Sequence, residues 1–331
     1  MKLTFAYQEW LYAETFRISR GAKDISPLFL AVLRDGHGHG RGECGVLTQY
    51  GQTPADVRSA FEALPPELPD GLSRADIPGL TPNRSVRNAL DSALWDLECR
   101  RSHADIWTLT GVERPESLEV DLTISVNATP RMVADALSAA ARGYRILKLK
   151  ADRHEVVDRV EAIAAAVPGA RFVVDANEAW DMATLERVAP RLAELGVELI
   201  EQPLRHGEDA ELEGYRGPIP VCADESCRDS DDLEVLRRRY QAINIKLDKV
   251  GGLTPGLVLA RGAREAGLKI MVGCSGPTSL GAAPAYVVGA LADYLDLDGP
   301  ALLLDDRADA MTYSGGRLHC MTGSLWGGDR R

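Results

Sequence analysis

The feature that most constrains the fold is a strand–helix unit that repeats from about residue 118 onwards. Each unit has an apolar stretch that ends in a polar side chain and is followed by a helical pattern. Eight such stretches occur, at 120–126, 146–150, 172–177, 198–203, 220–225, 243–248, 269–274 and 293–298. Apolar strands that alternate with helices are typical of parallel βαβ units with right-handed crossovers.

Two architectures accommodate eight parallel strands, a closed barrel and a doubly wound open sheet. The even spacing favours the barrel, and so does the absence of a G-x-G-x-x-G turn after the first strand. We therefore predict an α/β fold with a modified TIM (β/α) barrel. In such a barrel the carboxyl ends of the strands line the active site.

The first part of the chain has a different pattern. The stretch "LFLAVLRDGHGHGRGECGV" predicts two strands around a turn at Asp35-Gly36. An apolar stripe with helical spacing follows, made of Ala89, Ala93, Leu94 and Leu97. A hairpin with helices indicates an α+β region that precedes the barrel.

Composition excludes several classes of protein. The chain has 38 Lys and Arg against 49 Asp and Glu, a net charge of −11, so nucleic acid is not an expected partner. No apolar run resembles a signal peptide or reaches the roughly 18 residues that span a bilayer. We therefore expect a soluble cytoplasmic protein that does not bind membranes. The six cysteines are scattered, which predicts neither a disulfide framework nor a zinc site.

Five consecutive predicted strands end in a charged residue. In chain order these residues are Lys150, Asp175, Glu201, Asp224 and Lys246. They are about 22 to 26 residues apart, one βα unit each, so we expect all five at the same mouth of the barrel. A single acid at a strand end is more often a helix cap or a surface charge, and the regular order favours a functional site.

Three converging carboxylates without His or Cys indicate a hard cation. Mg²⁺ is the expected cofactor, because it binds a few carboxylates and keeps positions for water or substrate oxygens. The predicted ligands are Asp175, Glu201 and Asp224. Without a cation these acids would repel one another, and at least one would protonate.

The two lysines flank these carboxylates and indicate proton transfer. We expect Lys150 and Lys246 to take or return a proton on the carbon beside a metal-bound carboxylate, with pKa values lowered by nearby positive charge. Bases on opposite faces permit inversion of that carbon. Lys148 shares a strand face with Lys150. Edge-strand lysines are the alternative interpretation of this pair.

At these residues the chain resembles the enolase superfamily, within its muconate lactonizing enzyme subgroup. The motifs that carry the resemblance are "KLK" (148–150), "VVDAN", "LIEQP", "CADES" and "IKLDKVGG". It implies that Lys150 and Lys246 act on the reacting carbon, with Lys148 as a neighbouring positive charge. It also implies an α+β capping domain over 1–117, a barrel over 118–305, and a tail, 306–331, that returns to the capping domain.

Within the subgroup, "DLDGP" resembles the Asp-x-Asp motif of dipeptide epimerases. The resemblance implies that Asp296 and Asp298 hold the α-ammonium of a dipeptide, and that Arg20, in "FRISRG", binds an acidic side chain. Ser275 belongs to the loop "GCSGPTSLG", which we expect to line the substrate pocket. This loop has Gly-Pro where many relatives have Met and an acidic residue.

The expected function is thus Mg²⁺-dependent, two-base epimerisation of the C-terminal residue of a dipeptide, through a metal-stabilised enediolate. L-Ala-D/L-Glu is the favoured substrate, peptidoglycan recycling the implied context, and a homo-oligomer the expected assembly. The alternatives with the same fold are N-acylamino acid racemase, o-succinylbenzoate synthase and muconate cycloisomerase, whose substrates lack a free α-ammonium. A non-catalytic metal- or ligand-binding protein needs no lysine on both sides of the metal.

Overall fold

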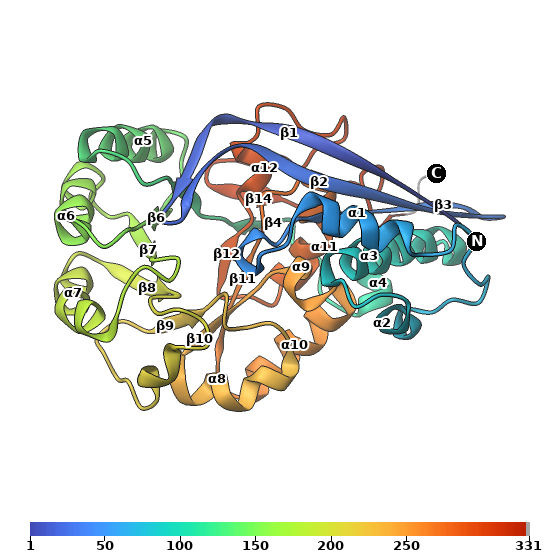
Figure 1. Cartoon of the computed structure of the whole chain (residues 1–331). Coiled ribbons are helices and arrows are strands. Elements are labelled where there is room, and N and C mark those ends of the chain that lie inside the picture. The colour runs from blue at the N-terminus through green and yellow to red at the C-terminus, as the bar shows by residue number, and fades with distance from the viewer. Residues whose placement is uncertain (329–331) are drawn as a thin grey trace.

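A parallel barrel of eight strands forms the centre of the computed structural model, which describes residues 1–328 (Figure 1). The strands are β5 (Leu122–Ile124), β6 (Ile146–Lys150), β7 (Arg171–Asp175), β8 (Val197–Glu201), β9 (Val221–Ala223), β10 (Ala242–Ile245), β11 (Lys269–Gly273) and β12 (Tyr294–Asp296). Each overlaps one of the predicted stretches, and neighbours in the sheet are neighbours in the chain. A backbone hydrogen bond of 3.0 Å from Asp121 N to Leu295 O joins the two end strands. The predicted barrel is confirmed.

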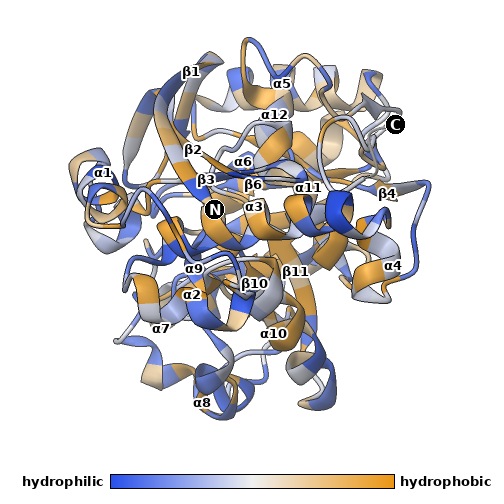
Figure 2. Cartoon of the chain, turned by 90° about the vertical axis from the view of Figure 1, so that its right-hand side faces the viewer, coloured by the Kyte–Doolittle hydropathy of each residue, from blue (hydrophilic) through white to orange (hydrophobic). Residues whose placement is uncertain are grey.

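Helices cover the outside of the barrel (Figure 1). They are α5 (Thr129–Ala141), α6 (Val156–Ala166), α7 (Met182–Glu194), α8 (Leu233–Arg239), α10 (Leu253–Glu265) and α11 (Ser279–Gly289). Shorter helical turns are η3 (Asp209–Leu212), η4 (Ser230–Asp232), α9 (Leu247–Val250) and α12 (Gly299–Leu302). Figure 2 shows the hydrophilic colours of α8 at the outside of the molecule and apolar colours on the more central α10 and β11.

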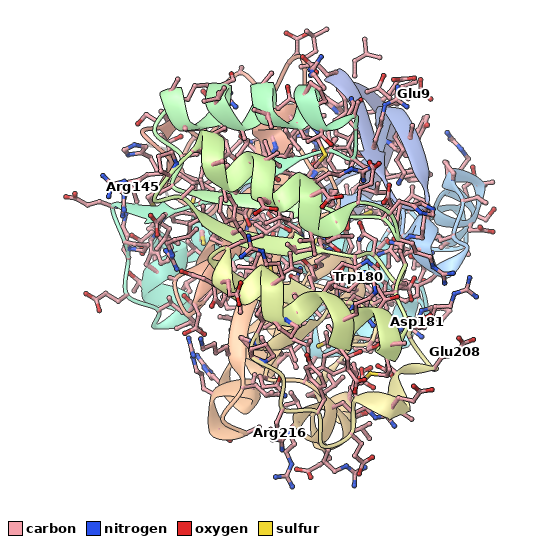
Figure 3. The ribbon with its side chains drawn as sticks, turned by 90° about the vertical axis from the view of Figure 1, so that its left-hand side faces the viewer. Glu9, Arg145, Trp180, Asp181, Glu208 and Arg216 are labelled. Atoms are coloured by element: carbon pink, nitrogen blue, oxygen red, sulfur yellow. The ribbon has the colours of Figure 1, made fainter. Side chains whose placement is uncertain are left out.

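Helix α7 illustrates why these segments are helical. Asp181, labelled in Figure 3, caps its first turn by accepting a hydrogen bond of 2.8 Å from Thr184 N. The buried positions are Leu185, Val188, Ala189 and Leu192. This i, i+3, i+4, i+7 spacing places one apolar face against the barrel and leaves the other to solvent.

An antiparallel sheet and several helices form the first part of the chain. The sheet consists of β1 (Lys2–Ile18), β2 (Gly21–Asp35) and β3 (Gly38–Gly45). The helical segments are η1 (Thr48–Tyr50), α1 (Pro54–Glu62), η2 (Arg74–Asp76), α2 (Ile77–Leu80), α3 (Arg84–Ser102) and α4 (Ile106–Thr110). The predicted hairpin around Asp35-Gly36 and the predicted helix are confirmed. Glycine at position 42 lets β3 approach α3, because a Cβ there would lie 2.0 Å from Ala89 O.

The end of the chain contacts the first part. The strands β13 (Tyr313–Ser314) and β14 (Arg317–His319) form a small antiparallel sheet with β4 (Ser117–Glu119). Buried Trp326 donates from Nε1 to Ser92 O on α3 at 3.0 Å. The limits 1–117, 118–305 and 306–331 stay predictions, and residues 329–331 lie outside the described residues.

None of the helices within residues 1–328 combines the length and the apolar character that crossing a membrane requires.

Candidate active site

The barrel interior is apolar at one level and polar at the next. The apolar level consists of Ile146, Val173, Leu199, Cys222, Ala242, Met271 and Tyr294. Two residues further along the same segments come Lys148, Asp175, Glu201, Asp224, Asn244, Gly273 and Asp296. Because residues two apart on a strand point to the same face, the second set lies in the interior just beyond the first. The polar level is therefore at the carboxyl ends of the strands, where active sites of such barrels lie.

The three predicted metal ligands lie in this polar level, at the ends of the neighbouring strands β7, β8 and β9. Asp175 and Glu201 are 0% exposed and Asp224 is 2% exposed. The sheet register places Asp175 directly beside Glu201 on the next strand. Burial, and then the neighbouring Asp175 carboxylate, raise the pKa of Glu201 to about 7. Three buried carboxylates with only oxygen donors fit a hard divalent cation such as Mg²⁺.

Ammonium groups contact each of these carboxylates. Lys150 Nζ lies 2.6 Å from Asp175 Oδ2, and Lys246 Nζ lies 2.7 Å from Asp224 Oδ2. Lys148 Nζ lies 2.6 Å from Glu201 Oε2. Lys150 ends β6 and Lys246 follows β10, so the strands that carry the acids, β7, β8 and β9, lie between the two lysines. This is the flanking arrangement predicted for two bases.

With the protein side chains alone and no cation, the pKa of Lys246 shifts in the direction opposite to the expected one. Burial lowers the pKa of Lys246, but the Asp224 and Glu201 carboxylates outweigh burial, and the pKa stands above its ordinary value. The pKa of Lys148 is likewise raised, because Asp296 and Glu201 outweigh its burial. The expectation considered the cation and neglected the acids, which are close enough to stabilise the charged forms of Lys246 and Lys148.

Three residues that support the ligands were not recognised in the sequence. Asn244 Nδ2 donates to Glu201 Oε1 at 2.7 Å, and Gln202 Oε1 accepts from Asp224 N at 2.9 Å. Lys249 Nζ lies 2.6 Å from Asp224 Oδ1. Asn244 had a detectable signal, since it is a polar residue two positions before Lys246 within an apolar strand.

A second group of acids lies beside the first. Asp121, Asp296 and Asp298 are at most 5% exposed, and one carboxylate oxygen of each lies within 4.8 Å of the others. Lys148 Nζ reaches Asp296 Oδ2 at 2.6 Å, and Thr123 N donates to Asp298 Oδ2 at 2.6 Å.

Burial, and then the Asp296 carboxylate, raise the pKa of Asp298 to about 6. Within residues 1–328, neither carboxylate oxygen of Asp121 has a hydrogen-bond partner. This acid trio is short of positive charge and suits a further cation. Sequence reasoning found Asp296 and Asp298 but missed Asp121, whose signal is an acidic residue directly before the first barrel strand.

A pocket of about 430 Å³ lies over both groups of acids. Its barrel side includes Thr123, Lys150, Asp224, Lys246, Asp296 and Asp298, together with Cys274, Ser275 and Gly276 from the loop after β11. Its other side includes Tyr12, Phe16, Arg20 and Lys23 from the β1–β2 hairpin. The loop that contains Ser275 therefore lines the pocket, as predicted.

Arg20 lines the pocket and also contacts acids of the barrel loops. Its Nη1 lies 2.6 Å from Glu178 Oε2, and its Nη2 lies 2.6 Å from Glu225 Oε1. These two ion pairs link the tip of the hairpin to the barrel.

Comparisons with known proteins agree with this fold and site. Residues 131–323 match the family model described as "Enolase C-terminal domain-like". The chain is 37% identical to the L-Ala-D/L-Glu epimerase of Escherichia coli K12, over 96% of this chain and 100% of that protein. It is also 37% identical to an N-acetyl-D-glutamate racemase of Pseudoalteromonas sp., over 91% of this chain and 95% of the other.

A solved structure resembles the whole chain. It is an enolase family member from Agrobacterium tumefaciens with homology to dipeptide epimerases, bound to sodium and L-Ala-L-Glu. It superposes with a TM-score of 0.94 at 38% identity and covers 98% of this chain and 99% of that one. The chain belongs to the enolase superfamily.

Proposed function

We propose that the protein is a Mg²⁺-dependent dipeptide epimerase that inverts the α-carbon of the C-terminal residue, with L-Ala-D/L-Glu as the favoured substrate. The observation that carries this proposal is the position of Lys150 and Lys246 on opposite sides of three buried carboxylates. The epimerases among the relatives support it. A protein that only binds a metal or a ligand needs no such pair of lysines.

Each side chain has a role in the proposed reaction. Asp175, Glu201 and Asp224 hold Mg²⁺, which when bound supplies positive charge to stabilise the negative charge that develops on the substrate carboxylate. One of the two lysines removes the α-proton from its side of the carbon. The other lysine delivers a proton to the opposite side, and the carbon is inverted. In the reverse direction the two lysines exchange roles.

The acid trio favours a free dipeptide over an N-acylated amino acid. The α-ammonium of a dipeptide brings a positive charge to Asp296 and Asp298, and Asp121 adds a third negative charge nearby. An N-acylated amino acid has no ammonium, so it would leave these buried acids short of positive charge. The same argument disfavours the substrates of o-succinylbenzoate synthase and muconate cycloisomerase.

We further propose that the enzyme acts in the recycling of cell-wall peptides, because L-Ala-D-Glu is a peptidoglycan dipeptide. Its cytoplasmic location and its homo-oligomeric state stay predictions.

Removal of the metal tests the function and the ligands together. We expect a chelator to reduce conversion of L-Ala-L-Glu into L-Ala-D-Glu to the background rate, and added Mg²⁺ to restore it. Asp224→Asn keeps the shape of the side chain but loses its charge, so metal affinity falls sharply. Chiral chromatography measures turnover, and titration calorimetry measures Mg²⁺ binding.

Asp231→Asn removes an equal charge at an exposed position and serves as the control. Full activity in the chelated wild-type enzyme would contradict the assignment of Asp175, Glu201 and Asp224.

A further inference from the structure

The loop between β8 and β9 contains a buried acid that no step of the proposed reaction uses. Asp209 begins the turn η3 and is 2% exposed. Its Oδ2 accepts hydrogen bonds of 2.6 Å from Ser226 Oγ and from the Tyr240 hydroxyl. Arg239 Nη1 lies 2.8 Å from its Oδ1. The acid therefore joins the loop after β8 to the loop after β9 and to the end of α8.

Gln202 connects the two strands that carry the second and third predicted metal ligands. The sheet register pairs Glu201 with Cys222, and Gln202 N donates to Cys222 O at 2.9 Å. The side chain of Gln202 continues this contact beyond β9, because its Oε1 accepts a hydrogen bond of 2.9 Å from Asp224 N. The backbone of Asp224 is thus tied to the residue that follows Glu201, which sets the separation of these two ligands.

The group around Asp209 also holds Gln202 in an unusual conformation. Gln202 has a φ of 34°, in the left-handed region that residues with a side chain rarely adopt. Such a conformation persists only where the surrounding contacts enforce it. Here Gln202 Nε2 donates to Ser226 Oγ at 2.9 Å and to the Tyr240 hydroxyl at 3.1 Å. Both of these hydroxyl groups are the ones that Asp209 binds.

The carboxylate of Asp209 determines which way the Gln202 amide points. A carboxylate only accepts hydrogen bonds, so Ser226 and Tyr240 donate their protons to it and present lone pairs to Gln202. Burial, and then the Asp209 carboxylate, raise the pKa of Tyr240, so its hydroxyl keeps the proton that it donates. The amide nitrogen of Gln202 must then face the two hydroxyls, and its oxygen faces Asp224 N.

We propose that Asp209 is a positioning residue for the Mg²⁺ ligand Asp224, and that it acts through Ser226, Tyr240 and Gln202. This assignment rests on the metal site of the proposed function and adds the residue that fixes the backbone of one ligand. An uncharged amide at position 209 could donate to the two hydroxyls. The Gln202 amide would then be free to turn, and Asp224 N would lose its acceptor.

The test measures Mg²⁺ binding by titration calorimetry, together with turnover of L-Ala-L-Glu over a range of Mg²⁺ concentrations. We expect Asp209→Asn to weaken Mg²⁺ binding about 10- to 100-fold, the range for loss of a residue that orients a metal ligand. Saturating Mg²⁺ should restore most of kcat, because the lysines and the ligands are still present. Glu213→Gln removes an exposed acid from the same loop, 3.8 Å from Arg238, and is the matched control.

Two further variants separate orientation of the amide from loss of a negative charge. Ser226→Ala and Tyr240→Phe change no charge and keep the ion pair between Asp209 and Arg239, yet each should also weaken Mg²⁺ binding. The combined loss in Asp209→Asn with Ser226→Ala should be smaller than the sum of the single losses, because both changes break the same path. These neutral variants carry the test if Asp209→Asn does not fold.

Two results would overturn the assignment. Wild-type Mg²⁺ affinity in Asp209→Asn, with kcat lowered equally at every Mg²⁺ concentration, would give Asp209 a role in folding only. Unchanged affinity in both Ser226→Ala and Tyr240→Phe would show that Asp209 acts by its charge and orients nothing. A wild-type enzyme that binds Mg²⁺ without epimerising dipeptides would overturn the proposed function, and calorimetry would still decide the role of Asp209. Wild type that binds no Mg²⁺ would overturn both.

Discussion

Lys150→Ala and Lys246→Ala are each expected to reduce epimerisation about 100- to 10,000-fold, the range for loss of a general acid–base group. Inversion needs removal of a proton on one side of the carbon and delivery on the other. A variant that keeps only one of the two lysines can carry out only one of these two proton transfers. Each variant should nevertheless exchange the α-proton of one epimer with solvent, because its remaining lysine still serves that face.

Exchange in D₂O separates the two roles. Each pure epimer of Ala-Glu is incubated with each variant and Mg²⁺, and NMR follows loss of the α-proton signal. Lys150→Ala should exchange one epimer and Lys246→Ala the other. Lys269→Ala, at an exposed position at the start of β11, serves as the control. Interconversion by Lys246→Ala at the wild-type rate would replace the two-base mechanism with a one-base mechanism.

Asp298→Asn should strongly impair turnover of free dipeptides. Removal of one carboxylate leaves a desolvated ammonium without its partner, at a cost of roughly 2–5 kcal/mol. This corresponds to a fall in kcat/KM of about thirty-fold to several thousand-fold. The side-chain oxygen of asparagine still accepts the hydrogen bond from Thr123 N, so the variant should fold.

N-Acetylated dipeptides lack the α-ammonium, so comparing their turnover with that of free dipeptides isolates the contribution of the ammonium. Wild type should turn over N-acetyl-L-Ala-L-Glu poorly, and Asp298→Asn should discriminate less between the free and the acetylated form. Asp305→Asn, at an exposed position, is the control for loss of an acid from this part of the chain. Preference of the wild type for N-acetylated dipeptides or N-acylated amino acids would replace the dipeptide epimerase with an N-acylamino acid racemase. The metal ligands and both lysines would keep their roles.

The barrel and its principal site were predictable from sequence for a simple physical reason. Parallel strands have a side-chain period of two and a common direction, so residues that end successive strands must meet at one mouth. Lys150, Asp175, Glu201, Asp224 and Lys246 stand at such ends, and their positions follow from the chain alone.

Other parts of the site depend on contacts between distant segments. Nothing near Arg20 in the sequence indicates that Glu178 and Glu225 would neutralise it. Asp121 is a single acidic residue directly before the short strand β5, and its place beside Asp296 and Asp298 becomes visible only when the last strand lies beside the first. The lysine pKa values also depend on the sum of all neighbouring charges, which the order of the strands does not supply.

The central claim is that this chain epimerises the C-terminal residue of a dipeptide, and isotope incorporation tests it most directly. The wild-type enzyme is incubated with Mg²⁺ and a dipeptide library in D₂O, with N-acylated amino acids in parallel. Mass spectrometry identifies the molecules that gain deuterium, and fragmentation locates it. We predict one deuterium at the C-terminal α-carbon of L-Ala-L-Glu, with both epimers formed. Deuterium gained only by N-acylated amino acids, or by no member of either set, would contradict the account.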